Sequence, residues 1–354
     1  MPGIARVLIA DRFGVVRDEV QPHVESVSWI LNGIGTAKMT FSTSDKKATQ
    51  DNLSVSNRVW IEFDDGLPVW AGIIDLPRSW ADGTISITAY TIEHLLQYRV
   101  SDRSSYFDNA PVGAILVRML QEMEARQTES VRIGDVWLGG MGHYPVYHYK
   151  SLWDIIRSIR KLESCDVVFQ PQLESGRISW LAHLKERWGA DRSASVMLAE
   201  GYNISEISYE EQGPLYNYIV AAGAGTTWTN ERIIIAAEDT ESRQRYGLRE
   251  RMDVYSDVSL APTLEKHARN RLLQSAWPLR RFGLTVVDAE PGKFSAYDVG
   301  DIVRLIAPGV GWGYDGAVRI IAREFAPATG VCKLAVDEWR EGEVFIRDLR
   351  EEQE

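Results

Sequence analysis

Residues 246–306 read YGLRERMDVYSDVSLAPTLEKHARNRLLQSAWPLRRFGLTVVDAEPGKFSAYDVGDIVRLI, and this stretch decides the expected fold. Its pattern predicts a strand, a helix, a strand, a turn and a strand. Leu264 and Leu272 share one stripe of the helix, which is typical of a helix lying across a sheet. Pro262 suits the start of this helix, and Pro278 ends it because proline clashes with the preceding turn. The stretch predicts a packing unit and contains no catalytic pattern.

The first hundred residues predict short antiparallel strands joined by turns. The turn sequences are Asp11–Gly14, Asn32–Gly35, Asp64–Gly66 and Trp80–Gly83. Residues 84–90 alternate strictly between polar and apolar side chains, and a short helix is expected over 91–98. Strands at this spacing indicate a barrel or a sandwich.

The remaining chain divides into three expected parts. Residues 101–200 combine helices and strands: an apolar stripe follows Pro111, and Ser151 with Asp154 forms a capping box at the start of another helix. Residues 201–340 return to strands, with the helix at 263–276 crossing them, and 341–354 form a charged tail expected to be a short exposed helix or frayed. We therefore expect a mainly β protein: two antiparallel β-barrel domains, 1–100 and 201–340, plus a peripheral α+β domain. A strand from about 205–225 is able to rejoin the first barrel.

Composition argues against nonspecific nucleic-acid binding, a disulfide framework, secretion and a membrane span. The net charge of −11 opposes nonspecific binding to phosphate, although an acidic wall would let DNA slide past without adhering. Cys165 and Cys332 lie in apolar surroundings far apart in sequence, which favours two buried thiols over a disulfide framework. The sequence contains no secretory signal and no apolar run long enough to cross a bilayer, so we expect synthesis in the cytosol and no membrane span.

No pattern predicts an active site. Gly223-Ala224-Gly225 lacks the lysine of a phosphate-binding loop, and the spacing of His143 and His148 suits an aromatic loop better than a metal site. Acidic pairs occur beside strands, where solvated carboxylates are usual. No serine stands in a nucleophile elbow, and no HExxH motif occurs. We expect no catalytic residue, no cofactor and no metal.

The residues singled out are therefore structural. Those expected to hold turn geometry are Gly72, Gly83, Gly223, Gly247, Asp298, Gly300 and Asp301. For the two aspartates the alternatives are a turn cap and a pair of solvated carboxylates. Twelve tryptophans are many for this length, and tryptophan is common at the centre of subunit contacts. Candidate contact residues are Trp70, Trp80, His143, Tyr147, Trp228 and Trp312.

Three sets of motifs together resemble a known family. The first set is Trp70–Ile74, Asp82–Tyr90 and His94–Leu96; the second is Asn217–Gly223; the third is Tyr246-Gly247-x-Arg249, the Trp277-Pro278 break, Asp298–Val303 and Arg319–Ile321. Their order and spacing are similar to those of the hub or tail-tip proteins in the baseplates of long-tailed phages. That family is related in fold to the hub of T-even baseplates and to the first half of type VI secretion spikes.

The resemblance implies a structural virion protein without enzymatic activity. The expected assembly is a homotrimer at the virion tail tip, assembled in the host cytoplasm. Two tail-tube-like barrels from each subunit would adapt a sixfold tail tube to a threefold tip around the channel for DNA ejection. The implied partners are distal tail or tail-tube ring proteins, the tape-measure protein, and tail fibre or receptor-binding proteins, with DNA only in transit.

Three alternatives stay open at this point. One is a distal tail ring subunit that assembles as a hexamer. Another is a tail enzyme that degrades the cell wall, for which acidic pairs such as Glu210-Glu211 would supply the carboxylates. The third is the same fold in a contractile injection system or a gene-transfer particle.

Overall fold

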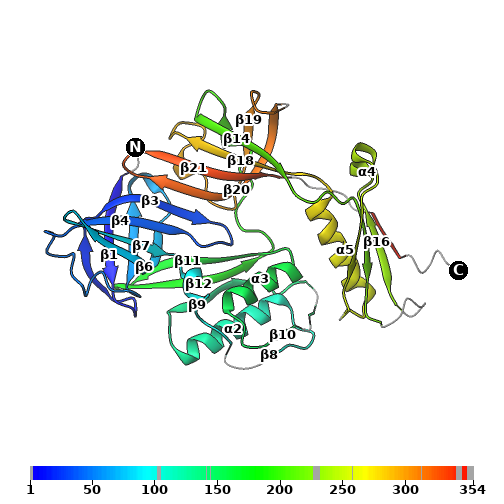
Figure 1. Ribbon diagram of the computed structural model, residues 1–354, viewed down its shortest axis with the longest axis horizontal. Coiled ribbons are helices and arrows are strands. Elements are labelled where there is room, and N and C mark those ends of the chain that lie inside the picture. Colours follow the sequence, from blue (N-terminus) through cyan, green and yellow to red (C-terminus); the bar gives the residue numbers. More distant parts are fainter. Residues whose placement is uncertain are drawn as a thin grey trace.

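The protein is built around one large antiparallel sheet. The computed structural model describes residues 3–101, 105–140, 142–143, 145–225, 232–256, 258–311, 313–339 and 345–348. Thirteen strands form the sheet, and most follow the order β14-β18-β21-β20-β3-β4-β7-β6-β5-β1-β2, with β19 pairing β20 and β13 pairing β19. Figure 1 shows this sheet at the upper left, with an α+β layer below it and a separate lobe at the right.

The N-terminal half of the sheet consists of hairpins. Its strands are β1 (Ile4–Ala10), β2 (Val16–Val20), β3 (His23–Ile30), β4 (Thr36–Ser42), β5 (Arg58–Phe63), β6 (Trp70–Ala81) and β7 (Thr84–Tyr90). A 3-10 turn over Asp64–Gly66 follows β5, and helix α1 (Ile92–Leu95) follows β7. The four turns predicted from the sequence each join two antiparallel strands, which confirms those hairpins.

The C-terminal half of the sheet also consists mainly of antiparallel strands. Its strands are β13 (Met197–Ala199), β14 (Ile204–Gln212), β18 (Leu279–Val286), β19 (Ile302–Ala307), β20 (Tyr314–Ala326) and β21 (Val331–Glu338), with a 3-10 turn over Phe294–Ala296. Strand β20 pairs with β3 in antiparallel register, with Arg323 opposite Trp29. This seam joins the halves, so the two predicted barrel domains are two parts of one sheet that stays open among the described strands.

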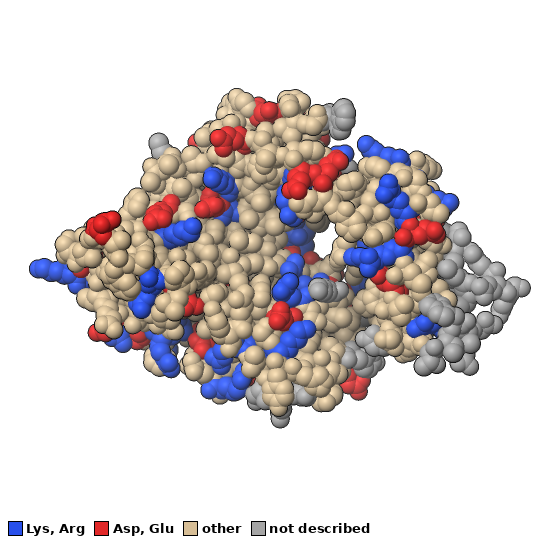
Figure 2. Space-filling view, in the orientation of Figure 1, with Lys and Arg blue, Asp and Glu red and all other residues tan. Residues whose placement is uncertain are grey.

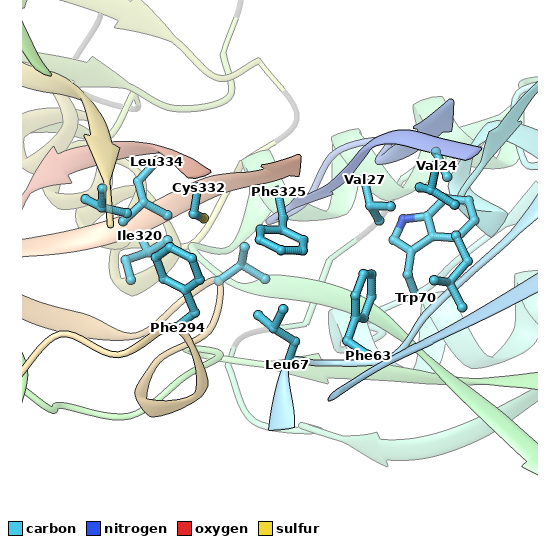
Figure 3. Close-up of a cluster of buried hydrophobic side chains, with 14 of the residues drawn as sticks. Val24, Val27, Phe63, Leu67, Trp70, Phe294, Ile320, Phe325, Cys332 and Leu334 are labelled. Atoms are coloured by element: carbon cyan, nitrogen blue, oxygen red, sulfur yellow. The ribbon is translucent and has the colours of Figure 1, made fainter. Parts of the chain in front are cut away.

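One apolar core runs under both halves. Val27, Phe63 and Trp70 come from the N-terminal half, and Phe294, Ile320 and Cys332 come from the C-terminal half. Figure 3 shows Phe325 between these two groups. The Phe325 ring lies 5.9 Å from that of Phe63 and 6.0 Å from that of Phe294, measured between centroids. The two halves therefore share a core as well as a strand pairing.

The α+β layer covers the opposite face of the N-terminal half. Its elements are β8 (Ser105–Tyr106), α2 (Val112–Arg126), β9 (Val131–Val136), β10 (Val146–Tyr147), α3 (Leu152–Leu162), β11 (Asp166–Glu174) and β12 (Arg177–Lys185). A second core joins side chains of α2 and α3 to Leu8, Trp60 and Ile73 of the large sheet. Ser151 caps α3 by accepting from the Asp154 amide at 3.1 Å, while the Asp154 carboxylate accepts from the Ser151 hydroxyl rather than from a backbone donor.

A small lobe forms the remainder of the described chain. Strands β15 (Tyr218–Ala222), β16 (Ile234–Glu238), β17 (Glu250–Val254) and β22 (Phe345–Asp348) make a four-stranded sheet in the order β17-β15-β16-β22. Helix α4 (Thr240–Tyr246) follows β16, and helix α5 (Ala261–Ser275) packs on the sheet through Leu264, Ala268 and Leu272.

The lobe corrects two expectations. The helix predicted to cross the second barrel lies on β15 and β16 instead, because Ile219, Ala221 and Ile235 present the apolar face that its stripe needs. The tail predicted as helix or frayed chain contains strand β22, which pairs with β16 from Ile235 to Glu238 and so satisfies the backbone at that edge. The expected second domain, residues 201–340, combined this lobe with the C-terminal half of the large sheet, whereas the two have separate sheets.

Candidate functional site

The best-defined site is a junction where the α+β layer meets both halves of the sheet. Asp166, at the start of β11, is buried and accepts a hydrogen bond from Nδ2 of Asn32 at 2.7 Å. Its other carboxylate oxygen accepts from the Trp188 amide at 2.8 Å and from Arg319. Arg319 lies in β20 and also donates from Nε to the Gly300 carbonyl at 3.1 Å. One carboxylate thus ties the β3–β4 turn, the α+β layer and the C-terminal half together.

The turn at 298–301 completes this junction. Asp301 is buried and accepts from the Ala190 amide and from Nε of Arg192, both at 2.7 Å. It also accepts from the Asp298 amide at 3.0 Å, which is the capping geometry of a tight turn. Burial raises the pKa of the Asp298 carboxyl above its usual value. The structure therefore places these aspartates in a buried turn and not in solvent.

Gly300 is required at this point by close approach of the backbone. Its φ of +92° is a conformation that side chains rarely adopt, and a Cβ there would lie 2.8 Å from the Trp188 carbonyl oxygen. The glycine lets the turn contact the segment that follows β12.

Arg58 makes a second tie between the N-terminal half and the α+β layer. Its guanidinium donates to the carbonyl of Ile178 at 2.7 Å, that of Arg12 at 2.9 Å and that of Glu129 at 3.1 Å. It lies over the Trp180 ring, 4.9 Å from the centroid. Burial lowers the pKa of Arg58 to about 10, so the group stays charged at neutral pH.

Arg323 lies fully buried at the β20–β3 seam. It donates to the carbonyl of Tyr297 at 3.0 Å and to that of Phe294 at 2.9 Å. Its guanidinium also lies 5.6 Å from the centroid of the Trp29 ring. A charge inside the shared core is costly unless it is bonded, so these contacts fix how the two halves meet.

The other four predicted turn glycines lie in four different places. Gly83 (φ +74°) and Asp82 (φ +50°) form the two-residue turn of the β6–β7 hairpin, where both residues need positive φ. Gly72 lies in β6 against the Tyr90 carbonyl, Gly223 lies after β15 against the Val258 carbonyl, and Gly247 ends α4. Only Gly300 and the two aspartates meet at the junction.

The predicted contact residues divide into buried and exposed side chains. Trp70, His143 and Tyr147 are buried within this chain: Trp70 donates to the Ser28 carbonyl at 3.0 Å, and Nε2 of His143 lies 3.1 Å from Glu163. Trp80 is 59% exposed. Trp228 and Trp312 lie outside the described residues.

Trp80 belongs to a surface on the β6–β7 hairpin that is formed by the exposed side chains of Leu76 and Trp80 with Arg78 between them, whereas Leu53 and Ile85 beside it are buried. Leu76 is 63% exposed at a bulge where the pairing with β7 shifts register. Arg78 donates to the Leu53 carbonyl at 2.6 Å and lies over the Trp80 ring at 5.5 Å. A groove of about 370 Å³ lies between this hairpin and the Ala48–Leu53 loop. Large apolar side chains beside a groove are typical of a protein contact surface.

Within the described residues, no group of three or more His, Cys, Asp and Glu side chains could hold a metal ion. Of the helices in the described part of the chain, none has both the length and the hydropathy needed to cross a bilayer.

The sequence did not predict that four charged residues tie the parts together, although Arg319 stands in one of the quoted motifs; the four are Arg58, Asp166, Arg319 and Arg323. A signal was present for Arg323, since it falls on the inward side of β20, whose next inward residue is Phe325. Asp166 and Arg58 likewise precede apolar strand residues and are buried themselves. A charge at an inward strand position indicates a bonded core residue.

Comparison with known proteins places the whole chain in one fold. No protein-family model matches it, and neither does any curated protein sequence. The prophage tail protein gp18 of Listeria monocytogenes is 13% identical with a TM-score of 0.64, and the match covers 96% of each chain. The 43 kDa tail protein of prophage MuSo2 from Shewanella oneidensis is 14% identical with a TM-score of 0.62, over 95% of this chain and 98% of that one.

A third similar structure belongs to a secretion system. It is an Escherichia coli component of the type VI secretion system that is itself structurally similar to the T4 bacteriophage tail proteins gp27 and gp5. It is 9% identical with a TM-score of 0.52, and the match covers 92% of this chain and 77% of that one. The chain therefore has the fold of these phage tail proteins, which confirms the resemblance in fold seen in its motifs.

Proposed function

We propose that this protein is a structural subunit of a tail, and that it forms a homotrimeric hub at the tail tip. The observation that carries the proposal is that each match to a prophage tail protein covers nearly all of this chain and nearly all of the matched chain. A match over one domain would leave room for an unrelated activity in the rest. Here the shared part includes the large sheet, the α+β layer and the lobe.

The geometry of the sheet supports three copies. Each chain contributes two sets of antiparallel strands, joined at the β20–β3 seam and sharing one core. Three chains would place six such sets around an axis, so that a threefold assembly could stand on a sixfold tube. The Asp166–Arg319 pair and the contact of Arg323 with the Trp29 ring would keep the two sets in a fixed relation within each chain, and Arg58 would hold the N-terminal set to the α+β layer.

The exposed hairpin surface is the part of this chain best suited to a subunit contact. Leu76 and Trp80 are exposed apolar side chains on a rigid hairpin, and Arg78 beside them is held by the Leu53 carbonyl. Aromatic and arginine side chains carry most of the binding energy in protein interfaces. We propose that this surface contacts a neighbouring subunit or a ring protein of the tail tube.

The net charge of −11 fits an assembly that surrounds a DNA channel. An acidic wall repels phosphate and would let the genome pass during ejection. Partners of the assembled hub would be ring proteins on one side, the tape-measure protein inside, and tail fibre or receptor-binding proteins outside.

The test is the copy number of the chain in its assembly. Purified protein should be examined by native mass spectrometry and by two-dimensional averages of negatively stained particles. Three copies per particle with threefold averages support the proposal. Six copies would support a distal tail ring instead, and turnover of peptidoglycan abolished by one carboxylate substitution would support an enzyme.

A further inference from the structure

The lobe formed by β15, β16, β17, β22, α4 and α5 has its own core. Its buried members include Ile219, Ile235, Leu264 and Leu272, and among the described residues none of them belongs to either of the other two cores. Its four-stranded sheet pairs with no strand of the other sheets in the described chain. The lobe is therefore a separate packing unit.

Narrow connections join the lobe to the large sheet. One runs from β14 through Gly213-Pro214 to β15, and another runs from α5 through Trp277-Pro278 to β18. The two lie side by side, because the Tyr216 amide donates to the Ser275 carbonyl at 2.8 Å. Figure 2 shows an opening between the lobe and the body on one side of these connections.

Beside this opening, the lobe contacts the α+β layer through a charged cluster. Glu163, directly after α3, is 1% exposed. One of its oxygens lies 3.1 Å from Nε2 of His143, and the other pairs with Nζ of Lys266 on α5. Lys266 also lies over the Trp137 ring, 5.8 Å from its centroid. A single carboxylate thus bridges the α+β layer and the lobe.

The packing beside this cluster leaves a void. A cavity of about 50 Å³ lies between the two units, lined on one side by His143 and Leu162 and on the other by Thr263 and His267. Interfaces between domains that are polar and incompletely packed permit relative motion. Here the contact consists of the charged cluster and of the His143 and His267 rings, whose centroids lie 6.3 Å apart, whereas each unit is held internally by an apolar core.

We propose that the lobe is a hinged arm and that Glu163 is the latch that holds it against the α+β layer. The hinge is formed by the connections at Gly213-Pro214 and Trp277-Pro278, together with the passage of the chain from β21 to β22. Removing the charge of Glu163 breaks the ion pair of Lys266 across the contact, so the lobe swings away while all three cores stay packed. The inference goes beyond the proposed tail function and does not depend on it.

The test measures the distance between the lobe and the body in the full chain. Cysteines introduced at Gln121 of α2 and Gln244 of α4, which are both exposed, carry spin labels for pulsed electron resonance. The native Cys165 and Cys332 are buried, and burial raises the pKa of their thiols to about 12 and about 11, so they resist labelling. The labelled protein that keeps Glu163 and Lys266 should give one narrow distribution of the distance between the two spin labels.

Glu163→Gln and Lys266→Met should each add a second population at longer distance. The matched control is Glu174→Gln, which makes the same change at an exposed ion pair with Arg132 within the α+β layer and should leave the distribution narrow. Circular dichroism confirms folding, and Lys266→Met, which changes a partly exposed side chain, decides the matter if Glu163→Gln does not fold. A narrow distribution in the folded latch variants overturns the proposal, and so does a broad one in the unsubstituted protein.

Discussion

Replacing Phe325 with alanine should loosen both halves of the large sheet together. The Phe325 side chain is completely buried and lies between Phe63 of the N-terminal half and Phe294 of the C-terminal half. Truncating a buried phenylalanine costs about 3–5 kcal/mol, and each aromatic pair adds about 0.5–1.5 kcal/mol beyond the buried area. We expect about 4–5 kcal/mol, the upper part of the truncation range, because the aromatic contacts are lost together with the buried area; this raises the unfolding equilibrium constant by roughly one to five thousandfold.

Hydrogen exchange read by mass spectrometry measures this effect in each strand separately. Backbone amides of β4 and of β21 should both exchange faster in the Phe325→Ala variant, because one core supports both strands. The lobe provides an internal reference, since its core is separate. The matched control is Phe13→Ala, a change at a 44% exposed side chain that should alter the free energy of unfolding by less than about 0.5 kcal/mol.

One result would refute the shared core. If amides of β21 exchange faster while those of β4 are unchanged, the two halves are independent domains that happen to touch. The seam between β20 and β3 would then be a contact of little energetic weight. Equal acceleration in both strands is the result that the structure predicts.

Three further predictions concern the junction, pH and assembly. Asp166→Asn should lower the free energy of unfolding by about 3 kcal/mol, because it leaves the largely buried Arg319 without its ion pair. Asp315→Asn at an exposed pair should cost less than about 1 kcal/mol, and urea titrations measure both. Burial raises the pKa of Glu93 from 4.5 to about 7. The protonated carboxyl therefore stabilises the fold below pH 4.5, and the free energy of unfolding should fall by up to about 3 kcal/mol between pH 4.5 and 7. In unfolding curves measured across that range, Glu93→Gln should flatten this pH dependence. A pH-independent difference between the two proteins would contradict this. Trp80→Ser should weaken self-association at least tenfold in sedimentation experiments while leaving the melting temperature within a few degrees, and unchanged association would remove the hairpin from the interface.

Local sequence predicted the parts of this fold whose partners lie nearby in the chain. The turn Asp82-Gly83 specifies a two-residue hairpin between β6 and β7, so pairing and register follow from a few residues. The stripe of Leu264 and Leu272 likewise identified α5 as a helix packed on a sheet. These signals act over one or two elements and need no knowledge of the rest of the chain.

Long-range choices were not predictable in the same way. The stripe of α5 suits any apolar sheet face, so it did not reveal that the helix packs on β15 and β16 rather than on β18. The seam between β20 and β3 joins strands nearly three hundred residues apart. Strand β22 was hidden because only the short apolar run Val344-Phe345-Ile346 marks it within a charged segment.

The candidate site shows the same division. Gly300 and Asp301 were identified because a glycine between aspartates predicts a tight turn. Asp166 and Arg319 were not, because their pairing spans 153 residues and brings the α+β layer against the C-terminal half. Only the tertiary fold shows that these charges are buried and paired.

The central claim is that three copies of this chain form a threefold hub, and the copy number in the assembled tail tests it most directly. Native mass spectrometry of the complex should give a particle of about 120 kDa, three times the 40.0 kDa of one chain, and reconstructed images should show threefold symmetry with six β units around the axis. A particle of six chains with true sixfold symmetry, or a chain that stays monomeric within the assembled tail, would contradict the account.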